Sequence, residues 1–260
     1  MSTADYSFSP VRDLRVCVLF LSRMPVGRIS GLERADLARA AWAFPLVGLI
    51  VGAISGGALY LLAGTGASPI ACALAALAVQ AIVTGALHED GLADVADGMG
   101  GRDREHTLEI MRDSRIGAYG VLALIFSVAI RAAMIAGIPG PGFACLTMIA
   151  AAMLSRGLLP AVMHALPPAR RDGLSRGAGQ PSLKIAAAAA AIGALALFTL
   201  LPLSVALAAV ALVLALGAAV LLWAQRKLGG QTGDVLGAVQ QMIEIAVLSA
   251  AAAGSSVFYA

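Results

Sequence analysis

Long apolar stretches separated by short polar segments are the main feature of this sequence. Residues 40–87 contain no charged side chain. This stretch is long enough for two membrane-crossing helices of about 20 residues each. The small residues at 64–66 favour a turn between the two helices, so we expect spans near 42–63 and 69–87.

The same pattern continues to the end of the chain. A Pro-Gly-Pro-Gly turn at 139–142 divides a second apolar stretch, and the stretch between Lys184 and Ala224 breaks at 201–204. Expected spans lie near 117–137, 143–163 and 237–258, with two more between Lys184 and Ala224. We therefore predict an all-α, polytopic integral membrane helix bundle of about seven transmembrane helices, forming a single domain over residues 1–260.

Composition indicates that lipid is the solvent for this chain. Of its 260 residues, 60% are hydrophobic and only 13% are charged, whereas charged residues make up about 25% of a typical soluble domain. The formal net charge of +3 does not indicate nucleic-acid binding, because the surplus lies in short loops, where it sets membrane orientation. The lipid bilayer is therefore an expected partner, and nucleic acid is not.

Charges are segregated between two sets of loops. The turns 64–68, 138–142 and 201–204 contain none. The alternating connections carry Arg28, Arg34, Arg39, Arg102, Arg104, Arg112, Arg115, Arg170, Arg171, Arg176, Arg226 and Lys227. Because cytoplasmic loops retain Lys and Arg, we predict a cytoplasmic N-terminus and an external C-terminus.

Two features near the N-terminus predict packing rather than chemistry. Within the N-terminal segment 1–40, Val11–Pro25 is too short and too charged to span a membrane, so we expect an interfacial amphipathic helix. Gly48, Gly52 and Gly56 recur every four residues in the first span. This spacing predicts a flat helix face on which a neighbouring helix packs closely.

Acidic residues concentrate in one expected cytoplasmic catalytic loop, residues 88–116. Eight of the fifteen acidic side chains lie between positions 89 and 113. On a helix, Asp90, Asp94 and Asp97 share one face because their spacing is i, i+4 and i+7. Such carboxylates repel one another unless a cation lies among them, and oxygen ligands favour Mg²⁺ or Mn²⁺. We predict a divalent-metal site; the alternative is a charged helix end at the membrane surface.

Two arginines follow the acidic run on a short amphipathic helix that is expected to lead into the third span. The planar guanidinium groups of Arg112 and Arg115 suit bidentate binding of phosphate. The alternative is that each arginine anchors the chain at the membrane surface.

A second polar segment, the glycine-rich cytoplasmic loop 225–237, precedes the last span. Its glycines, including Gly230 and Gly233, allow backbone N–H groups to approach a ligand. The helix that follows begins here with its positive dipole end. With Thr232, these groups form a candidate phosphate site; the alternative is an ordinary helix start.

Two arginines and one glutamate fall inside the expected spans, where a charge is costly. Glu244 lies near the same helix face as Gln240 and Gln241, and we expect it to line a cavity. We expect Arg156 to extend toward the cytoplasm, and Arg131 either to reach the outer surface or to pair within the bundle. For both arginines we favour a structural role.

Five ordered blocks resemble the signature blocks of the cobalamin synthase family. They are FLSRMPVG at 20–27, FPLVGLIVG at 44–52, HEDGLADVADG at 88–98, LEIMRDSRIGAYG at 108–120 and GGQTGDVLGA at 229–238. The resemblance therefore covers nearly the whole chain. One departure is Glu89, where the family's run more often reads His-Leu-Asp-Gly; the extra carboxylate bears on metal affinity and leaves the three aspartates in place.

The resemblance implies an enzyme of the bacterial inner membrane with its active site facing the cytoplasm. The implied reaction is Mg²⁺-dependent and joins α-ribazole, or its 5′-phosphate, to adenosylcobinamide-GDP with release of GMP. It is a phosphotransfer, in which metal ions and fixed charges do most of the work. The oligomeric state stays open, with a homo-oligomer as one alternative.

Carried onto this chain, the resemblance implies roles for particular side chains. The implied Mg²⁺ ligands are Asp90, Asp94, Asp97 and Asp234. The implied phosphate-binding groups are Arg112, Arg115, Gly230, Thr232 and Gly233. One of the aspartates, foremost Asp94 or Asp90, or else His88, is the candidate base for the ribazole 5′-hydroxyl.

Two rival functions come from different classes of protein. A CDP-alcohol phosphotransferase also sets aspartates on helices at the membrane surface, but Asp94 follows Asp90-Gly91-Leu92-Ala93 where such an enzyme carries Ala-Arg. A cation transporter also places acids within helices. Here, however, the carboxylates are expected to gather at one face of the membrane instead of its midplane.

Overall fold

The computed structural model describes residues 9–29, 31, 34–170 and 178–256. Its elements are α1 (Pro10–Leu21), α2 (Arg34–Ala40), the 3₁₀ helix η1 (Ala41–Ala43), α3 (Phe44–Ala63), α4 (Pro69–Thr84), α5 (Leu87–Gly98), α6 (Arg104–Ile110), α7 (Ala118–Gly137), α8 (Pro141–Ala165), α10 (Leu183–Leu200), α11 (Leu203–Leu228) and α12 (Gly233–Ser256). Proline stands in the first turn of α1, α3, α4 and α8, where its missing N–H removes no helical hydrogen bond. Over these residues the fold is all-α, as predicted.

Six of the described helices are long and apolar enough to cross a membrane, or seven if α4 and α5 together form one broken span. The expected second span, 69–87, is wrong at its end because α4 stops at Thr84. Gly85 and Ala86 both adopt positive φ angles, 67° and 54°, and the chain bends by 92° into α5. The expected cytoplasmic loop 88–116, in which a helical acidic run and a short amphipathic helix were predicted, contains nearly all of α5 and the whole of α6.

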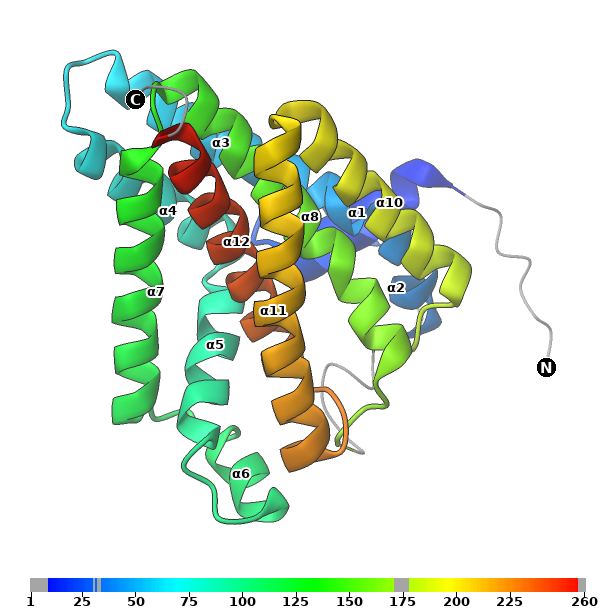
Figure 1. Cartoon of the computed structure of the whole chain (residues 1–260). Helices are drawn as coiled ribbons and strands as arrows, with labels where there is room; N and C mark the ends of the chain where they lie inside the picture. Colours follow the sequence, from blue (N-terminus) through cyan, green and yellow to red (C-terminus); the bar gives the residue numbers. More distant parts are fainter. Residues whose placement is uncertain (1–8, 30, 32–33, 171–177, 257–260) are drawn as a thin grey trace.

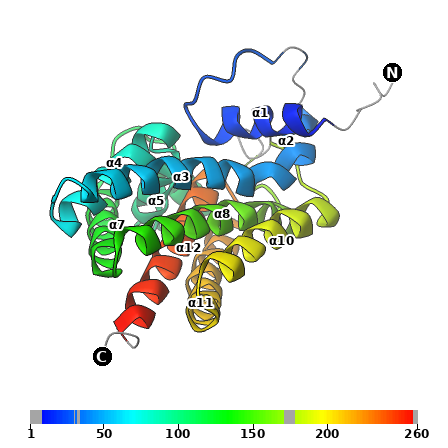
Figure 2. The ribbon, with the colours of Figure 1, turned by 90° about the horizontal axis from the view of Figure 1, so that it is seen from above.

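The glycines at 48, 52 and 56 bring α3 into close contact with α8, which confirms the predicted flat face. A Cβ atom on Gly48 would lie 2.2 Å from the carbonyl oxygen of Ala152, and one on Gly52 would lie 2.7 Å from the Cα of Ile149. Seen from above, α3, α8 and α10 run side by side and cross the steeper helices α7 and α11 (Figure 2).

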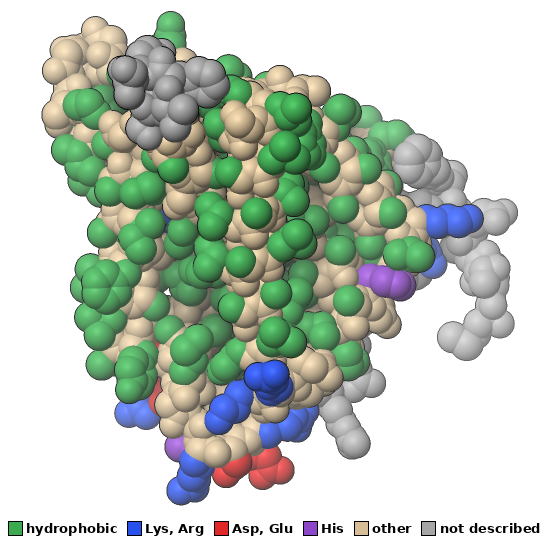
Figure 3. Space-filling model, in the orientation of Figure 1, with side chains coloured by type: hydrophobic (Ala, Val, Ile, Leu, Met, Phe, Trp, Pro, Cys, Tyr) green, Lys and Arg blue, Asp and Glu red, His purple; other side chains and the backbone are tan. Residues whose placement is uncertain are grey.

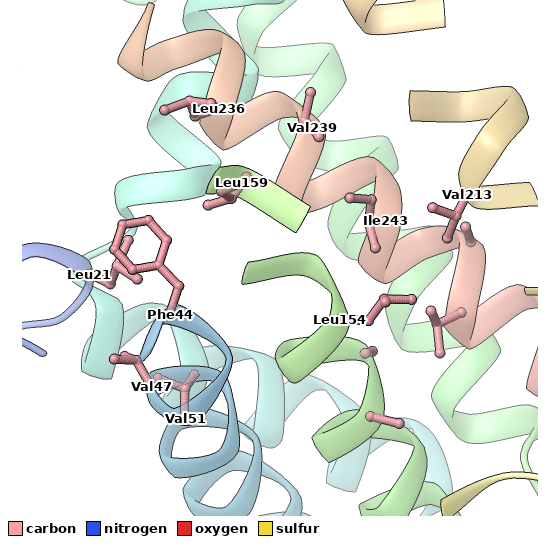
Figure 4. Close-up of a cluster of buried hydrophobic side chains, with 14 of the residues drawn as sticks. Leu21, Phe44, Val47, Val51, Leu154, Leu159, Val213, Leu236, Val239 and Ile243 are labelled. Carbon is pink, nitrogen blue, oxygen red and sulfur yellow. The ribbon is translucent and has the colours of Figure 1, made fainter. Parts of the chain in front are cut away.

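The last helix, α12, lies at the centre of the bundle and packs against α5, α7, α8 and α11. Figure 4 shows its apolar side chains Leu236, Val239 and Ile243 beside Leu154 and Leu159 of α8. All five side chains are buried. Because α12 is surrounded by other helices, the residues at its first turn are held in a fixed place relative to α5.

The N-terminal segment packs on the bundle, and α1 is the short helix predicted there. Val16, Cys17, Val18 and Leu21 are buried, whereas Val11 remains 71% exposed. Polar contacts fix this helix in place: Trp42 Nε1 donates to Asp13 Oδ2 at 2.9 Å, and Arg12 pairs with Asp36 at 2.7 Å.

The two ends of the bundle differ in charge. In Figure 1 the turns between α3 and α4, α7 and α8, and α10 and α11 lie at the upper end, whereas α6 and the connection from α11 to α12 lie at the lower end. Charged side chains gather at that lower end and green apolar side chains cover the flank above it (Figure 3). Arg171 and Arg176, two of the predicted cytoplasmic charges, lie outside the described residues. The segregation fits the predicted topology, and the cytoplasmic location of the charged end stays a prediction.

Candidate active site

The acidic helix α5 crosses the start of α12 at a pair of glycines. A Cβ atom on Gly91 would lie 2.8 Å from the carbonyl oxygen of Asp234, and one on Gly237 would lie 3.1 Å from the carbonyl oxygen of His88. The two backbones are therefore in direct contact, because any larger side chain would separate them. This crossing joins the sequence blocks 88–98 and 229–238, which are far apart along the chain.

The crossing gathers carboxylates from both helices. Asp94 is half-buried and Asp90 is exposed. Asp234, Asp90 and Asp97 all lie near enough to Asp94 to repel its charge, and Arg170 lies near enough to attract it. The structure thus places the other three predicted aspartates within electrostatic range of Asp94, although it does not test their function.

Asp97 also has a partner in the protein itself. Its Oδ2 accepts a hydrogen bond from Gly117 N–H at 2.7 Å, and its Oδ1 accepts one from Gly120 N–H at 2.8 Å. The carboxylate therefore satisfies backbone donors at the first turn of α7. A Cβ atom on either glycine would lie 2.4 Å from this carboxylate. Any side chain larger than glycine at position 117 or 120 would therefore displace Asp97. A metal-binding role for Asp97 stays a prediction, and it has to coexist with these bonds.

The donor set at the crossing suits Mg²⁺ when substrate supplies further oxygens. Across the described ranges, no group of three or more His, Cys, Asp or Glu side chains is placed to hold a metal ion alone. Mg²⁺ usually needs only one or two carboxylates, with substrate phosphates and water completing its shell. Asp94 and Asp234, on facing helices, offer such a pair.

The glycine-rich segment differs from the predicted loop 225–237. Its first residues belong to α11 and its last to α12, so only 229–232 connect the helices. Gly230 packs against another segment: a Cβ atom there would lie 2.2 Å from the carbonyl oxygen of Pro167, and Gln231 N–H donates to that oxygen at 2.8 Å. Close packing on Pro167 therefore accounts for Gly230 without a ligand.

The remaining residues of this segment begin α12. Thr232 is buried, and its Oγ1 accepts a hydrogen bond from Val235 N–H at 3.2 Å and lies 3.2 Å from Asp234 Oδ2. Apart from its chain neighbours and the nearby backbone of its own helix, no described atom lies within 4 Å of a Cβ placed on Gly233. Thr232 thus caps the helix and positions Asp234, while the backbone at Gly233 is open to a ligand.

The two predicted phosphate-binding arginines are placed differently. Arg112 lines a pocket of about 440 Å³ at the charged end of the molecule, together with Arg104 and Arg170. Arg115 is instead 88% exposed and pairs with Asp113 at 2.7 Å. Hydrogen bonds from the Arg115 side chain and backbone lower the pKa of Asp113 to about 2. Of the two, Arg112 lines this pocket and Arg115 does not.

Arg170 is a candidate site residue that sequence reasoning missed. Its Nη1 lies 3.7 Å from Asp234 Oδ2, and its Nη2 donates to the carbonyl oxygen of Leu108 at 3.2 Å. The guanidinium therefore connects the acidic crossing with the pocket beside α6. Nothing in the sequence distinguishes Arg170 from the neighbouring loop charges Arg171 and Arg176.

A buried polar cluster lies deeper in the bundle and is centred on Glu244. Gln80 Nε2 donates to the two oxygens of Glu244 at 2.7 and 2.8 Å, and Arg131 and Arg156 each pair with it at 3.2 Å. Arg131 also pairs with Glu89 at 3.2 Å. The cluster therefore ties α12 to α4, α7 and α8, and holds the first turn of α5 directly before Asp90.

This cluster corrects two expectations from the sequence. Arg156 does not extend to the cytoplasm: its side chain is 0% exposed and pairs with Glu244. Glu244 is 2% exposed, so it is enclosed within the cluster and does not line an open cavity. Arg131 pairs within the bundle, which was one of its two predicted alternatives.

His88 is also buried, at 3% exposure. Its Nε2 has no hydrogen-bond partner among the described residues. On α5, positions six residues apart point about 120° away from each other, so His88 lies on a different side of the helix from Asp94. Its role as a base stays a prediction.

Comparison with known proteins gives a consistent result over the whole chain. Residues 13–252 match the family model described as cobalamin-5-phosphate synthase. The chain is 46% identical to the adenosylcobinamide-GDP ribazoletransferase of Bradyrhizobium diazoefficiens, over 94% of each chain. It is 47% identical to that of Rhizobium etli, over 97% of this chain and 99% of the relative. No solved structure matches the chain. The protein therefore belongs to the cobalamin-5-phosphate synthase family.

Proposed function

We propose that this chain is a membrane-bound transferase that joins α-ribazole, or its 5′-phosphate, to adenosylcobinamide-GDP and releases GMP. Family membership and the names of the relatives support this activity. The observation that carries the site assignment is the crossing of α5 and α12, where Asp94 lies beside Asp234 and Arg170.

The proposed reaction needs a nucleophile, a base and charge stabilisation. The nucleophile is a ribose ring hydroxyl of the ribazole, because the 5′-hydroxyl expected from the sequence is not free in the 5′-phosphate, and its oxygen attacks the phosphorus that bears cobinamide. The bond from that phosphorus to the bridging oxygen breaks, and GMP leaves with the electron pair. The hydroxyl proton passes to a base, for which Asp94 and Asp90 on the acidic face of α5 are the first candidates and His88, whose side chain lies on a different side of that helix, is the third.

The crossing and the pocket beside α6 together provide groups for each task. Asp94 and Asp234 would hold Mg²⁺, with Asp90 and Asp97 as further ligands, and the bound ion would neutralise charge on the diphosphate. The open backbone at Gly233 and the guanidinium of Arg112 would bind phosphate oxygens. We keep Arg115, Thr232 and Gly230 as weaker candidates because each already has another structural partner.

The direct test is to incubate the purified full chain with adenosylcobinamide-GDP and α-ribazole. We expect GMP and adenosylcobalamin to form in equal amounts, with the reaction stopped by EDTA and restored by excess Mg²⁺. Adenosylcobinamide without the GDP group is the control and should give neither product. Failure of the wild-type protein to release GMP from adenosylcobinamide-GDP with either α-ribazole or its 5′-phosphate would contradict the proposed function.

We further propose that the protein lies in the bacterial inner membrane with the charged end in the cytoplasm. Reporter fusions after Gly66, Gly140 and Ser204 should report the outside, and fusions after Gly101 and Gly230 the inside, because Lys and Arg are retained on cytoplasmic loops. An inside signal at Gly140 together with an outside signal at Gly230 would show that the protein has the opposite orientation in the membrane.

A further inference from the structure

The pocket beside α6 contains charges of both signs. It has a volume of about 440 Å³, within the range of about 300–1,000 Å³ that is typical of small-molecule sites. Arg104, Arg112 and Arg170 line it together with Glu105 and Glu109. A site for phosphate alone would need only the arginines, and the two glutamates, both exposed on α6, add hydrogen-bond acceptors to the same pocket.

Hydrogen bonds between distant segments hold the pocket walls in place. Arg104 Nε donates to the carbonyl oxygen of Leu228 at 2.8 Å, and its Nη2 donates to that of Ala169. On the opposite wall, Arg170 donates a hydrogen bond to the carbonyl oxygen of Leu108 in α6. The pocket is therefore bounded by α6, by Arg112 just after it and by the segment after α8, and Arg104 also ties α6 to the end of α11.

Glu105 and Glu109 lie one turn apart on α6, so their carboxylates share a face and repel each other. Within the part of the chain that the structure describes, neither carboxylate has a hydrogen-bond or ion-pair partner. Carboxylates accept hydrogen bonds and cannot donate them when ionised. A ligand that brings N–H donors to this wall would relieve the repulsion.

We propose that this pocket binds the guanosine end of the GDP group and that Glu105 and Glu109 recognise the guanine base; this rests on the proposed function. Guanine presents two adjacent donors, N1–H and the N2 amino group, that one carboxylate can accept together. Adenine presents the unprotonated N1 at the same edge and would repel a carboxylate. The pocket thus selects guanine over adenine.

The position of Arg170 indicates how the bound nucleotide is oriented in the pocket. Because its guanidinium lines the pocket and also lies 3.7 Å from Asp234, the diphosphate of a bound nucleotide lies between the pocket and the acidic crossing. GMP then leaves into the water-facing pocket, while the phosphorus that bears cobinamide is placed beside Asp94.

The test measures binding of GMP, IMP and AMP to the purified full chain by equilibrium dialysis, without any turnover. Wild type should bind GMP at least tenfold more tightly than AMP, with IMP between them because it lacks the N2 amino group. Glu105→Gln or Glu109→Gln should reduce the preference for GMP over AMP about tenfold, the effect of losing one charge-assisted hydrogen bond.

Two further variants separate recognition of the base from binding of the phosphate. Arg112→Gln should weaken GMP and AMP alike, because phosphate is common to both nucleotides. Arg226→Gln, at the exposed end of α11 outside the pocket, should change neither. Equal binding of GMP and AMP by wild type, or an unchanged preference in both glutamate variants, would overturn the inference. A wild-type protein that prefers GMP but releases none from adenosylcobinamide-GDP would contradict the proposed function alone.

Discussion

Replacing Asp94 by Asn is expected to slow GMP release by about a thousandfold or more while the protein still folds. The substitution keeps the size of the side chain and removes a charge from the centre of the acidic face. Loss of one metal-binding carboxylate in phosphoryl transfer costs about 4 kcal/mol of transition-state stabilisation, which corresponds to this factor. Folding should persist because the repulsion from Asp234 and Asp90 is reduced.

The measurement for Asp94→Asn is the rate of GMP release as a function of Mg²⁺ concentration. Asp113→Asn is the matched control, because Asp113 pairs only with the exposed Arg115 among the contacts described for it. Equal rates for wild type and Asp94→Asn at saturating Mg²⁺, with no shift in metal dependence, would remove Asp94 from the site.

Replacing Glu244 by Ala is expected to destabilise the fold by about 3–5 kcal/mol, the range measured when one partner of a buried ion pair is removed. Arg156, which is 0% exposed, would keep only its bond to the carbonyl oxygen of Ala152 among the described contacts. Arg131 would keep Glu89. Uncompensated positive charge would then remain in the bundle interior.

Thermal unfolding of the detergent-purified protein checks the Glu244 prediction. Glu244→Gln should be milder, because it retains an acceptor for Gln80, and the exposed Asp113→Asn should melt like wild type. A Glu244→Ala protein with the wild-type melting temperature would show that the cluster contributes little to stability.

Much of the fold follows from the sequence because lipid-crossing helices need long uncharged runs. The flat helix face at Gly48 and Gly52 could also be predicted from neighbouring residues alone, because glycines four residues apart lie on one side of a helix. The bend after α4 is different. Residues 85–86 are small and apolar like the span before them, so hydropathy gave no sign of a change in direction.

The sequence predicted which types of residue form the candidate site, but it predicted less well which residues contact one another there. The spacing of Asp90 and Asp94 identifies an acidic face, but the approach of Asp234 depends on how α5 and α12 cross. Gly230 packs on Pro167, a contact that the sequence did not predict because a glycine in sequence does not reveal which neighbour comes close, and its phosphate-binding role stays a prediction. Arg156 was misjudged for a similar reason: its partner Glu244 is on a different helix.

The central claim is that Asp94 of α5 and Asp234 of α12 serve one catalytic site. The most direct test is a double-mutant cycle on GMP release with Asp94→Asn, Asp234→Asn and both together. Groups that act as a unit are strongly non-additive. The account predicts that each single variant loses most of the activity and that the double variant is little slower than the worse single variant. Activity losses that multiply in the double variant, or an Asp234→Asn protein as fast as wild type, would contradict the account.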